Sequence, residues 1–122
     1  MPSTDVLALI RKGVAIPAYP LALNSKRKLD EQRARALARS WAAPMIKLTS
    51  VGVHSTQFEI REPKHNLLKP VLELAMSEMR QAGKPLVKVS GVCGPTAQAV
   101  KEAELAVSLG YDAGLLSLAA MK

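Results

Sequence analysis

The chain has 122 residues, of which 48% are hydrophobic and 22% are charged, and its net charge is +7. This length suits one domain with a modest core, and the composition is typical of a globular rather than a disordered protein. No apolar run approaches the roughly 20 residues of a membrane span, and the first residues do not resemble a secretory signal. The single cysteine, Cys93, excludes an intramolecular disulfide and suits a reducing compartment. We therefore expect a cytoplasmic protein with one domain over residues 1–122.

Turn residues divide the chain into alternating helices and strands. Gly13, Gly83 and Gly110 each follow a helical pattern and end it, because glycine readily takes the left-handed conformation of a helix C-terminus. Pro17 and Pro20 exclude both helix and central-strand pairing, so a loop follows the first strand. We expect helices at residues 5–12, 29–43, 70–82 and 96–109, and strands at residues 14–16, 45–53, 85–90 and 115–118.

The run from Lys84 to Leu118 gives the clearest fold signal. A β-branched strand leads through the glycine-rich turn 91–95 into a helix, and a second apolar strand follows. Two parallel strands need a crossover, usually a helix, so this run predicts a parallel βαβ unit. Strand starts recur about every 30 to 40 residues, which suits a (β/α) barrel or a doubly wound sheet. We expect four parallel strands that lie in chain order.

Much of the positive charge lies around the helix expected at residues 29–43, where Asp30 and Glu31 offset it in part. Aromatic residues make up only 3% of the chain, and basic and stacking side chains do not alternate, so no nucleic-acid-binding module is indicated. A solvated helix face is favoured over a phosphate-binding patch. The basic residues concerned are Lys26, Arg27, Lys28, Arg33, Arg35 and Arg39.

Four segments follow one another at the spacing of successive strands. They are Gly13–Pro20 (GVAIPAYP), Val51–Arg61 (VGVHSTQFEIR), Val89–Gly94 (VSGVCG) and Asp112–Leu118 (DAGLLSL). Together they resemble the first four strands of the dihydrodipicolinate synthase and N-acetylneuraminate lyase family, over nearly the whole chain. Residues 40–50 depart from the family, which has a glycine-containing turn there, and this leaves the start of the second strand open.

The resemblance implies the N-terminal half of a TIM (β/α)8 barrel, truncated after the fourth strand. Members of the family are class I aldolases or lyases, in which a lysine forms a Schiff base with pyruvate or another 2-oxo acid and the imine acts as an electron sink. No cofactor is implied. The Schiff-base lysine and a proton-relay tyrosine are expected beyond Lys122, so this chain alone should be inactive. The implied partners are a small 2-oxo acid and either further copies of the chain or the missing C-terminal half.

The same resemblance indicates substrate-binding residues after the second strand. The family holds the substrate carboxylate there with hydroxyl and backbone groups, and Gly52, His54, Ser55 and Thr56 occupy this place. Oxygen and backbone donors suit an anion, although the same residue types also suit a simple turn. Tyr19, between two prolines after the first strand, is expected to line the pocket or to cover the mouth of the barrel.

Other chemistry is not indicated. His54, His65 and Cys93 share no ligand spacing, so we predict no metal site. Cys93 has no evident base beside it and is expected to be a small lining residue rather than a nucleophile. Gly91 and Gly94 lack the spacing of phosphate-binding loops, and a close approach of backbones explains them. The alternative to a lyase is a non-catalytic basic α/β module that binds an acidic partner or nucleic acid.

Overall fold

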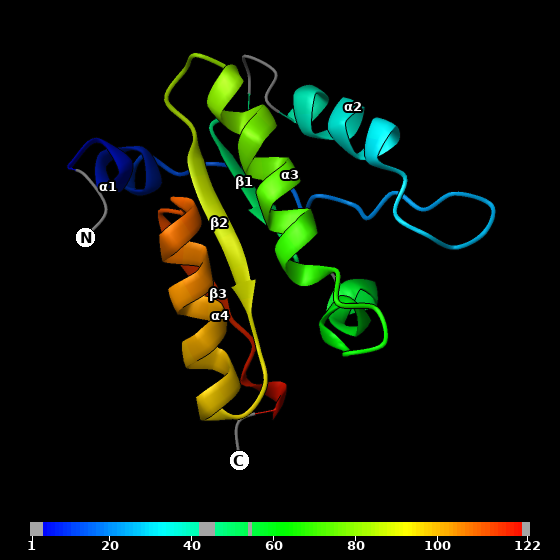
Figure 1. The fold of residues 1–122 in the computed structure, drawn as a ribbon. Coiled ribbons are helices and arrows are strands. Elements are labelled where there is room, and N and C mark those ends of the chain that lie inside the picture. Colours follow the sequence, from blue (N-terminus) through cyan, green and yellow to red (C-terminus); the bar gives the residue numbers. More distant parts are fainter. Residues whose placement is uncertain (1–3, 42–45, 54, 121–122) are drawn as a thin grey trace.

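The computed structural model describes residues 4–41, 46–53 and 55–120, and its α-helices and strands alternate from the second helix onward (Figure 1). The elements in chain order are α1 (Thr4–Arg11), α2 (Glu31–Trp41), β1 (Leu48–Val51), the 3-10 helix η1 (Ser55–Arg61), α3 (Leu68–Gln81), β2 (Val87–Val92), α4 (Thr96–Leu109), β3 (Ala113–Leu116) and the 3-10 helix η2 (Leu118–Ala120).

The strands form one parallel sheet in the order β1-β2-β3. Leu48 of β1 lies opposite Val87 of β2, and Val89 of β2 lies opposite Ala113 of β3. The parallel α/β architecture and the chain order of these three strands confirm the prediction. The part of the chain that the structure describes has three strands, however, and not the four that we expected.

The expected first strand, at residues 14–16, is wrong. Pairing with β1 is limited to one parallel bridge between Ala18 and Ser50, where the Tyr19 amide donates to the Ser50 carbonyl at 2.8 Å. Pro17 turns its backbone toward β1 but has no N–H group to donate, so this bridge cannot extend into a ladder toward residues 14–16. A cavity of about 630 Å³, lined by residues 13–17 with Ile46 and Lys47, replaces the expected pairing at the start of β1.

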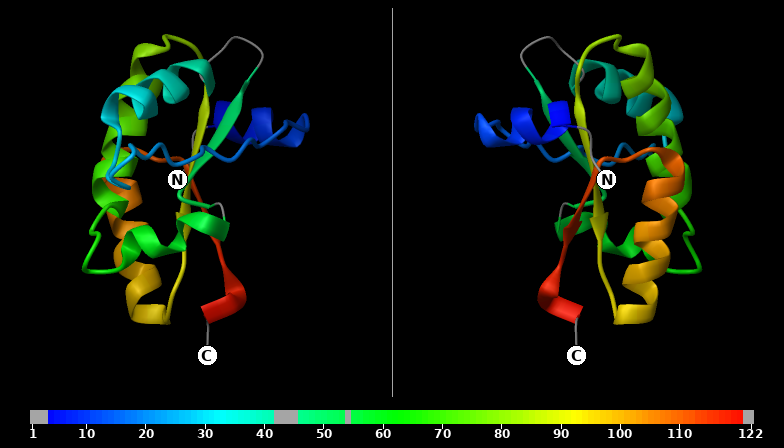
Figure 2. Two further views of the ribbon diagram at one scale, coloured as in Figure 1. Left: turned by 90° about the vertical axis from the view of Figure 1, so that its right-hand side faces the viewer. Right: turned by 90° about the vertical axis from the view of Figure 1, so that its left-hand side faces the viewer.

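The two faces of the sheet are covered by different helices. Helices α2, α3 and α4 lie on one face and the shorter α1 lies on the other (Figure 2). The larger core lies under α2–α4, where Leu72 and Val51 are fully buried. The smaller core contains Leu48, Val87 and Val89, packed against α1. Side chains of successive strand residues point to opposite faces, which is why Leu48 of β1 lies in the smaller core and Val51 of the same strand lies in the larger one.

The helix ends follow the turn residues closely. Helix α4 has the predicted bounds, and Gly110 ends it in the left-handed conformation with a φ of 91°. Helix α2 begins one residue after Asp30, whose carboxylate accepts a hydrogen bond from the Arg33 amide at 3.0 Å. That contact caps the first turn, because the first amides of a helix have no partner within it.

Candidate functional site at the carboxyl ends of the strands

The sheet directs its three carboxyl ends to the same edge, which is the lower edge in Figure 1. In parallel α/β proteins, ligands bind at this edge, because the loops that follow the strands converge there. The loop after β1 begins with Gly52 and continues into η1, and the loop after β2 begins with Cys93. This edge therefore carries the candidate functional site.

The sequence predicted a carboxylate-binding segment after β1. Gly52 is buried at the end of β1 and has a φ of 71°, a left-handed conformation that favours glycine. Ser55 and Thr56 begin η1, so the segment lies at the carboxyl edge as expected. His54 lies outside the described residues. The role of Gly52, His54, Ser55 and Thr56 in binding a substrate stays a prediction.

A buried arginine organises this edge. The Arg61 side chain is only 6% exposed, and its Nε lies 3.0 and 2.9 Å from the two carboxylate oxygens of Glu102 on α4. Its Nη2 donates to the carbonyl oxygens of Gly52, at 3.2 Å, and Gly91, at 3.0 Å. One guanidinium therefore joins the ends of β1 and β2 to α4.

Glu102 receives further hydrogen bonds from the loop after β2. Its carboxylate accepts from the Cys93 amide at 3.1 Å and from the Gln98 side-chain amide at 2.8 Å. The charge of this 7% exposed side chain is thus balanced by an arginine and by two neutral donors. A buried ion pair offsets its desolvation only when hydrogen bonds of this kind complete it. The loop after β2 is consequently held to the first turns of α4.

One donor of this cluster has no acceptor among the residues that the structure describes. The Nη1 atom of Arg61 is buried and makes no hydrogen bond to them. A buried donor left unpaired costs about 1–3 kcal/mol. The guanidinium carbon also lies 5.9 Å from the centre of the Phe58 ring, within the range of a cation–π contact.

Gly91 explains why the turn after β2 is rich in glycine. A Cβ atom at this position would lie 2.2 Å from the Gly52 carbonyl oxygen. Close backbone approach was the predicted reason for glycine here, and the structure confirms it. The expected start of the turn at Gly91 is wrong, however, since β2 continues to Val92. Gly91 therefore lies within β2, close to the backbone of Gly52.

Tyr19 lies in the larger core. Its side chain is 2% exposed, and its hydroxyl donates to the Ala34 carbonyl of α2. Burial, and to a lesser degree the negative charge of Glu78, raises the pKa of Tyr19 to about 12. Tyr19 thus joins α2 to the segment around the bridge with β1. That Tyr19 lines a substrate pocket stays a prediction.

The remaining candidate groups do not form a reactive centre. Burial raises the pKa of the Cys93 thiol, the opposite of what a nucleophilic cysteine needs. Lys84 donates to the Ile46 carbonyl at 2.8 Å, and desolvation lowers its pKa, but it precedes β2 at the amino end of the sheet. Lys88 is paired with Asp112 at 3.2 Å. Within the described ranges, no group of three or more His, Cys, Asp or Glu residues could hold a metal ion.

Sequence reasoning missed Arg61 and Glu102. Arg61 stood at the end of the Val51–Arg61 segment, and Glu102 stood three residues after Ala99 and four before Ala106, on one stripe of the helix. A charged residue on the sheet-facing side of a helix is the signal that was available, because such a residue is rarely buried without a partner. The sequence could not show which cation was that partner.

Alternating helices and parallel strands define the class of β/α-repeat proteins, with a polar cluster at the carboxyl edge of the sheet. Within this class the chain is similar to a crystal structure described as a "putative dihydrodipicolinate synthetase" from Pseudomonas aeruginosa, with a TM-score of 0.63 and 16% sequence identity. The similarity covers 83% of this chain and 33% of that chain, so the chain spans about a third of its length. No protein-family model matches the sequence, and no curated protein matches it. The likeness shows the fold.

Helix lengths bear on membrane insertion as well. None of the helices in the described ranges combines the length and the apolar character that crossing a bilayer requires.

Proposed function

We propose that this chain is the N-terminal part of a lyase or aldolase similar to the dihydrodipicolinate synthase and N-acetylneuraminate lyase family. The intact enzyme would act on pyruvate or another 2-oxo acid through a lysine Schiff base. The observation that carries the proposal is the structural likeness over 83% of the chain. The four sequence segments that resemble the family support it independently of that likeness.

In this proposal the segment from Gly52 to Thr56 binds the substrate carboxylate. The segment lies at the carboxyl edge of β1, and the Arg61 contacts to Gly52 and Gly91 hold the backbone at its start. Amide and hydroxyl donors at a fixed edge form charge-assisted hydrogen bonds with a carboxylate, which are stronger than neutral ones.

The chain by itself is proposed to bind without catalysis. Lys84 and Lys88 lie toward the amino end of the sheet and make the contacts described above, so neither stands where the imine would form. The nucleophilic lysine and the proton-relay tyrosine would come from a second half of the barrel. Further copies of the chain, or a partner that supplies the missing (β/α) units, would complete the sheet.

Borohydride trapping tests the catalytic part of the proposal. The purified chain is incubated with pyruvate and sodium borohydride, and its mass is measured after proteolysis. We expect no stoichiometric adduct on any single lysine. An adduct at one defined lysine, lost when that lysine is replaced by arginine, would contradict the proposed inactivity.

An NMR titration with pyruvate tests the binding segment. We expect the amide signals of Gly52, Ser55 and Thr56 to shift, and Ser55→Ala with Thr56→Ala to weaken binding by about tenfold, the equivalent of one charge-assisted hydrogen bond. Ser108→Ala is the control, because its hydroxyl only bonds the Leu105 carbonyl on an exposed turn of α4. Unchanged signals in the segment, or equal weakening by the control, would exclude this binding site.

A further inference from the structure

A second candidate site lies beside the carboxyl edge, on a hairpin that sequence reasoning treated as part of a solvated helix. Leu23 and Leu29 form an antiparallel bridge that closes this hairpin. The Asn24 side-chain oxygen accepts from the Lys26 amide at 2.9 Å and from the Lys28 amide at 3.1 Å. These contacts hold three successive basic residues, 26–28, at an exposed tip that projects from the body of the protein (Figure 1).

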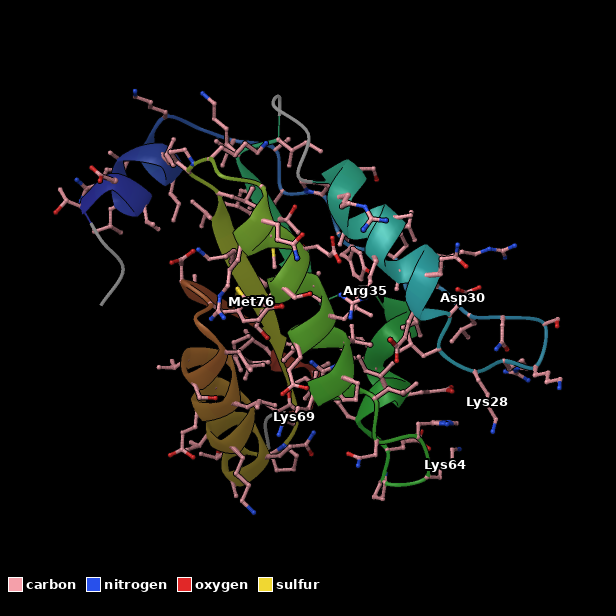
Figure 3. The ribbon with its side chains drawn as sticks, turned by 45° about the horizontal axis from the view of Figure 1, so that its top comes forward. Lys28, Asp30, Arg35, Lys64, Lys69 and Met76 are labelled. Atoms are coloured by element: carbon pink, nitrogen blue, oxygen red, sulfur yellow. The ribbon has the colours of Figure 1, made fainter. Side chains whose placement is uncertain are left out.

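The hairpin faces the loop that follows η1, and a pocket of about 490 Å³ lies between them. We call it the rim pocket. Figure 3 shows Lys28 of the hairpin and Lys64 of the loop on the same side of the molecule. The rim pocket is lined by the apolar residues Leu21, Leu23, Ile60 and Leu67 and by the charged or polar residues Arg27, Glu59, Lys64 and His65. Its volume lies within the range of small-molecule sites.

The lining of the rim pocket carries two cations, Arg27 and Lys64, and one carboxylate, Glu59, and these cations are paired less completely than those of the neighbouring helix. Arg35 and Arg39 of α2 both pair with the buried Glu78, at 3.0 and 3.1 Å. Lys64 pairs with Glu62 at 2.7 Å, and both side chains are well exposed, so solvent weakens that pair. Within the described ranges, no carboxylate lies within salt-bridge distance of Arg27. Arg27 is therefore available for an external anion.

The combination of walls and charges defines the kind of ligand. Apolar walls favour a hydrocarbon body, because removing it from water contributes about 25 cal/mol per Å². The planar guanidinium of Arg27 matches the two oxygens of a carboxylate or a phosphate, and Lys64 adds a second cation. We propose that the rim pocket binds a small organic oxyanion, a carboxylate or a phosphate monoester on an alkyl or aryl group. This proposal goes beyond the proposed lyase function and does not depend on it.

Calorimetric titration with three probes tests the proposal. The probes are phenyl phosphate, phenylacetate and inorganic phosphate, none of which is a 2-oxo acid. We expect phenyl phosphate or phenylacetate to bind at least about tenfold more tightly than inorganic phosphate, since only they fill the apolar walls. The better of the two identifies the oxyanion. Failure of both aryl probes to bind the unaltered chain would overturn the proposal.

A matched pair of variants distinguishes specific binding in the rim pocket from attraction by the net charge of the protein. Arg27→Gln with Lys64→Gln removes both cations of the rim pocket, and Arg11→Gln with Lys101→Gln removes the same charge from distant exposed positions. We expect the first variant to lose about tenfold or more in affinity for the better aryl probe and the second to change it less than about twofold. All four side chains replaced are on the surface, and circular dichroism checks that both variants are folded.

Two results would contradict the rim pocket directly. Equal loss of affinity in both variants would show that net charge alone attracts the probe. Tighter binding of a short single-stranded oligonucleotide than of either aryl probe, with a steep dependence on salt, would show that the hairpin contacts a nucleic acid backbone instead. Amide shifts confined to residues 21–29 and 59–67 on adding the aryl probe would support the proposal.

Discussion

The two faces of the sheet differ in how completely they are covered. Under α2–α4, Leu72 is fully buried, and the hydroxyl of Tyr111 donates to the Leu72 carbonyl at 2.9 Å. On the other face, α1 covers Leu48, Val87 and Val89 near the amino end of the strands. Leu115, two residues beyond Ala113 on that same face, is 56% exposed. The face under α2–α4 is thus buried, whereas the other face is buried only where α1 packs against it.

The described residues thus cover one face of the sheet with their own helices and leave part of the other face exposed. Three amphipathic helices bury their stripes on one face, as alternating β/α units do. The opposite face in a complete barrel is filled by side chains from the other strands. Leu115 and Leu116 lie on β3, the last strand of the described sheet, and Leu118 begins η2 just after it; all three are exposed. An apolar edge strand of this kind is a site of pairing with another chain.

The largest expected effect is on the state of association. We expect the purified chain to form dimers or larger assemblies at micromolar concentration, measured by sedimentation or light scattering. Leu115→Lys should shift the mass toward the monomer, because a charge on an edge strand opposes pairing. Val107→Lys is the control, since Val107 is 74% exposed on α4 and does not belong to a strand. A monomer that unfolds cooperatively in the unaltered chain would show that the exposed face needs no cover.

The next largest effect is expected on the free energy of unfolding when the Arg61–Glu102 ion pair at the carboxyl edge is broken. Arg61→Met leaves the Glu102 carboxylate buried without its cation, and we expect a loss of about 3–5 kcal/mol in the free energy of unfolding. Urea denaturation measures it. Arg33→Met provides the comparison, because Arg33 is 76% exposed and pairs with Asp30 at 3.6 Å, a surface contact worth less than about 1 kcal/mol. Equal losses in the two variants would mean that Arg61 is not an organising residue.

The smallest effect compares leucines on the two faces. Leu72→Ala opens a cavity in the larger core and should cost about 2–5 kcal/mol. Leu9→Ala removes a partly buried side chain of α1 from the smaller core, and we expect less than about half of that cost. Thermal unfolding of both variants at one protein concentration measures the difference. A cost for Leu9→Ala equal to that of Leu72→Ala would contradict the unequal cover of the two faces.

Local chemistry in the sequence determined much of the fold. Helix α4 has the predicted bounds because Gly110 can take a φ of 91°, and the parallel order of the strands followed from the helices between them. The close approach at Gly91 was predicted because glycine alone has no Cβ to clash. Each of these properties depends on a residue and its near neighbours in the chain.

Only the tertiary structure decided which charged side chains form ion pairs and which segments pair as strands. Arg61 and Glu102 are 41 residues apart in sequence, and no periodicity indicates that their side chains meet. The six basic residues around α2 were predicted to share one solvated face. The structure divides them instead, with Arg35 and Arg39 on Glu78, Arg33 beside Asp30, and residues 26–28 on the hairpin. The expected first strand did not form because pairing with β1 is limited to the single bridge at Ala18, and this pairing could be seen only in the structure.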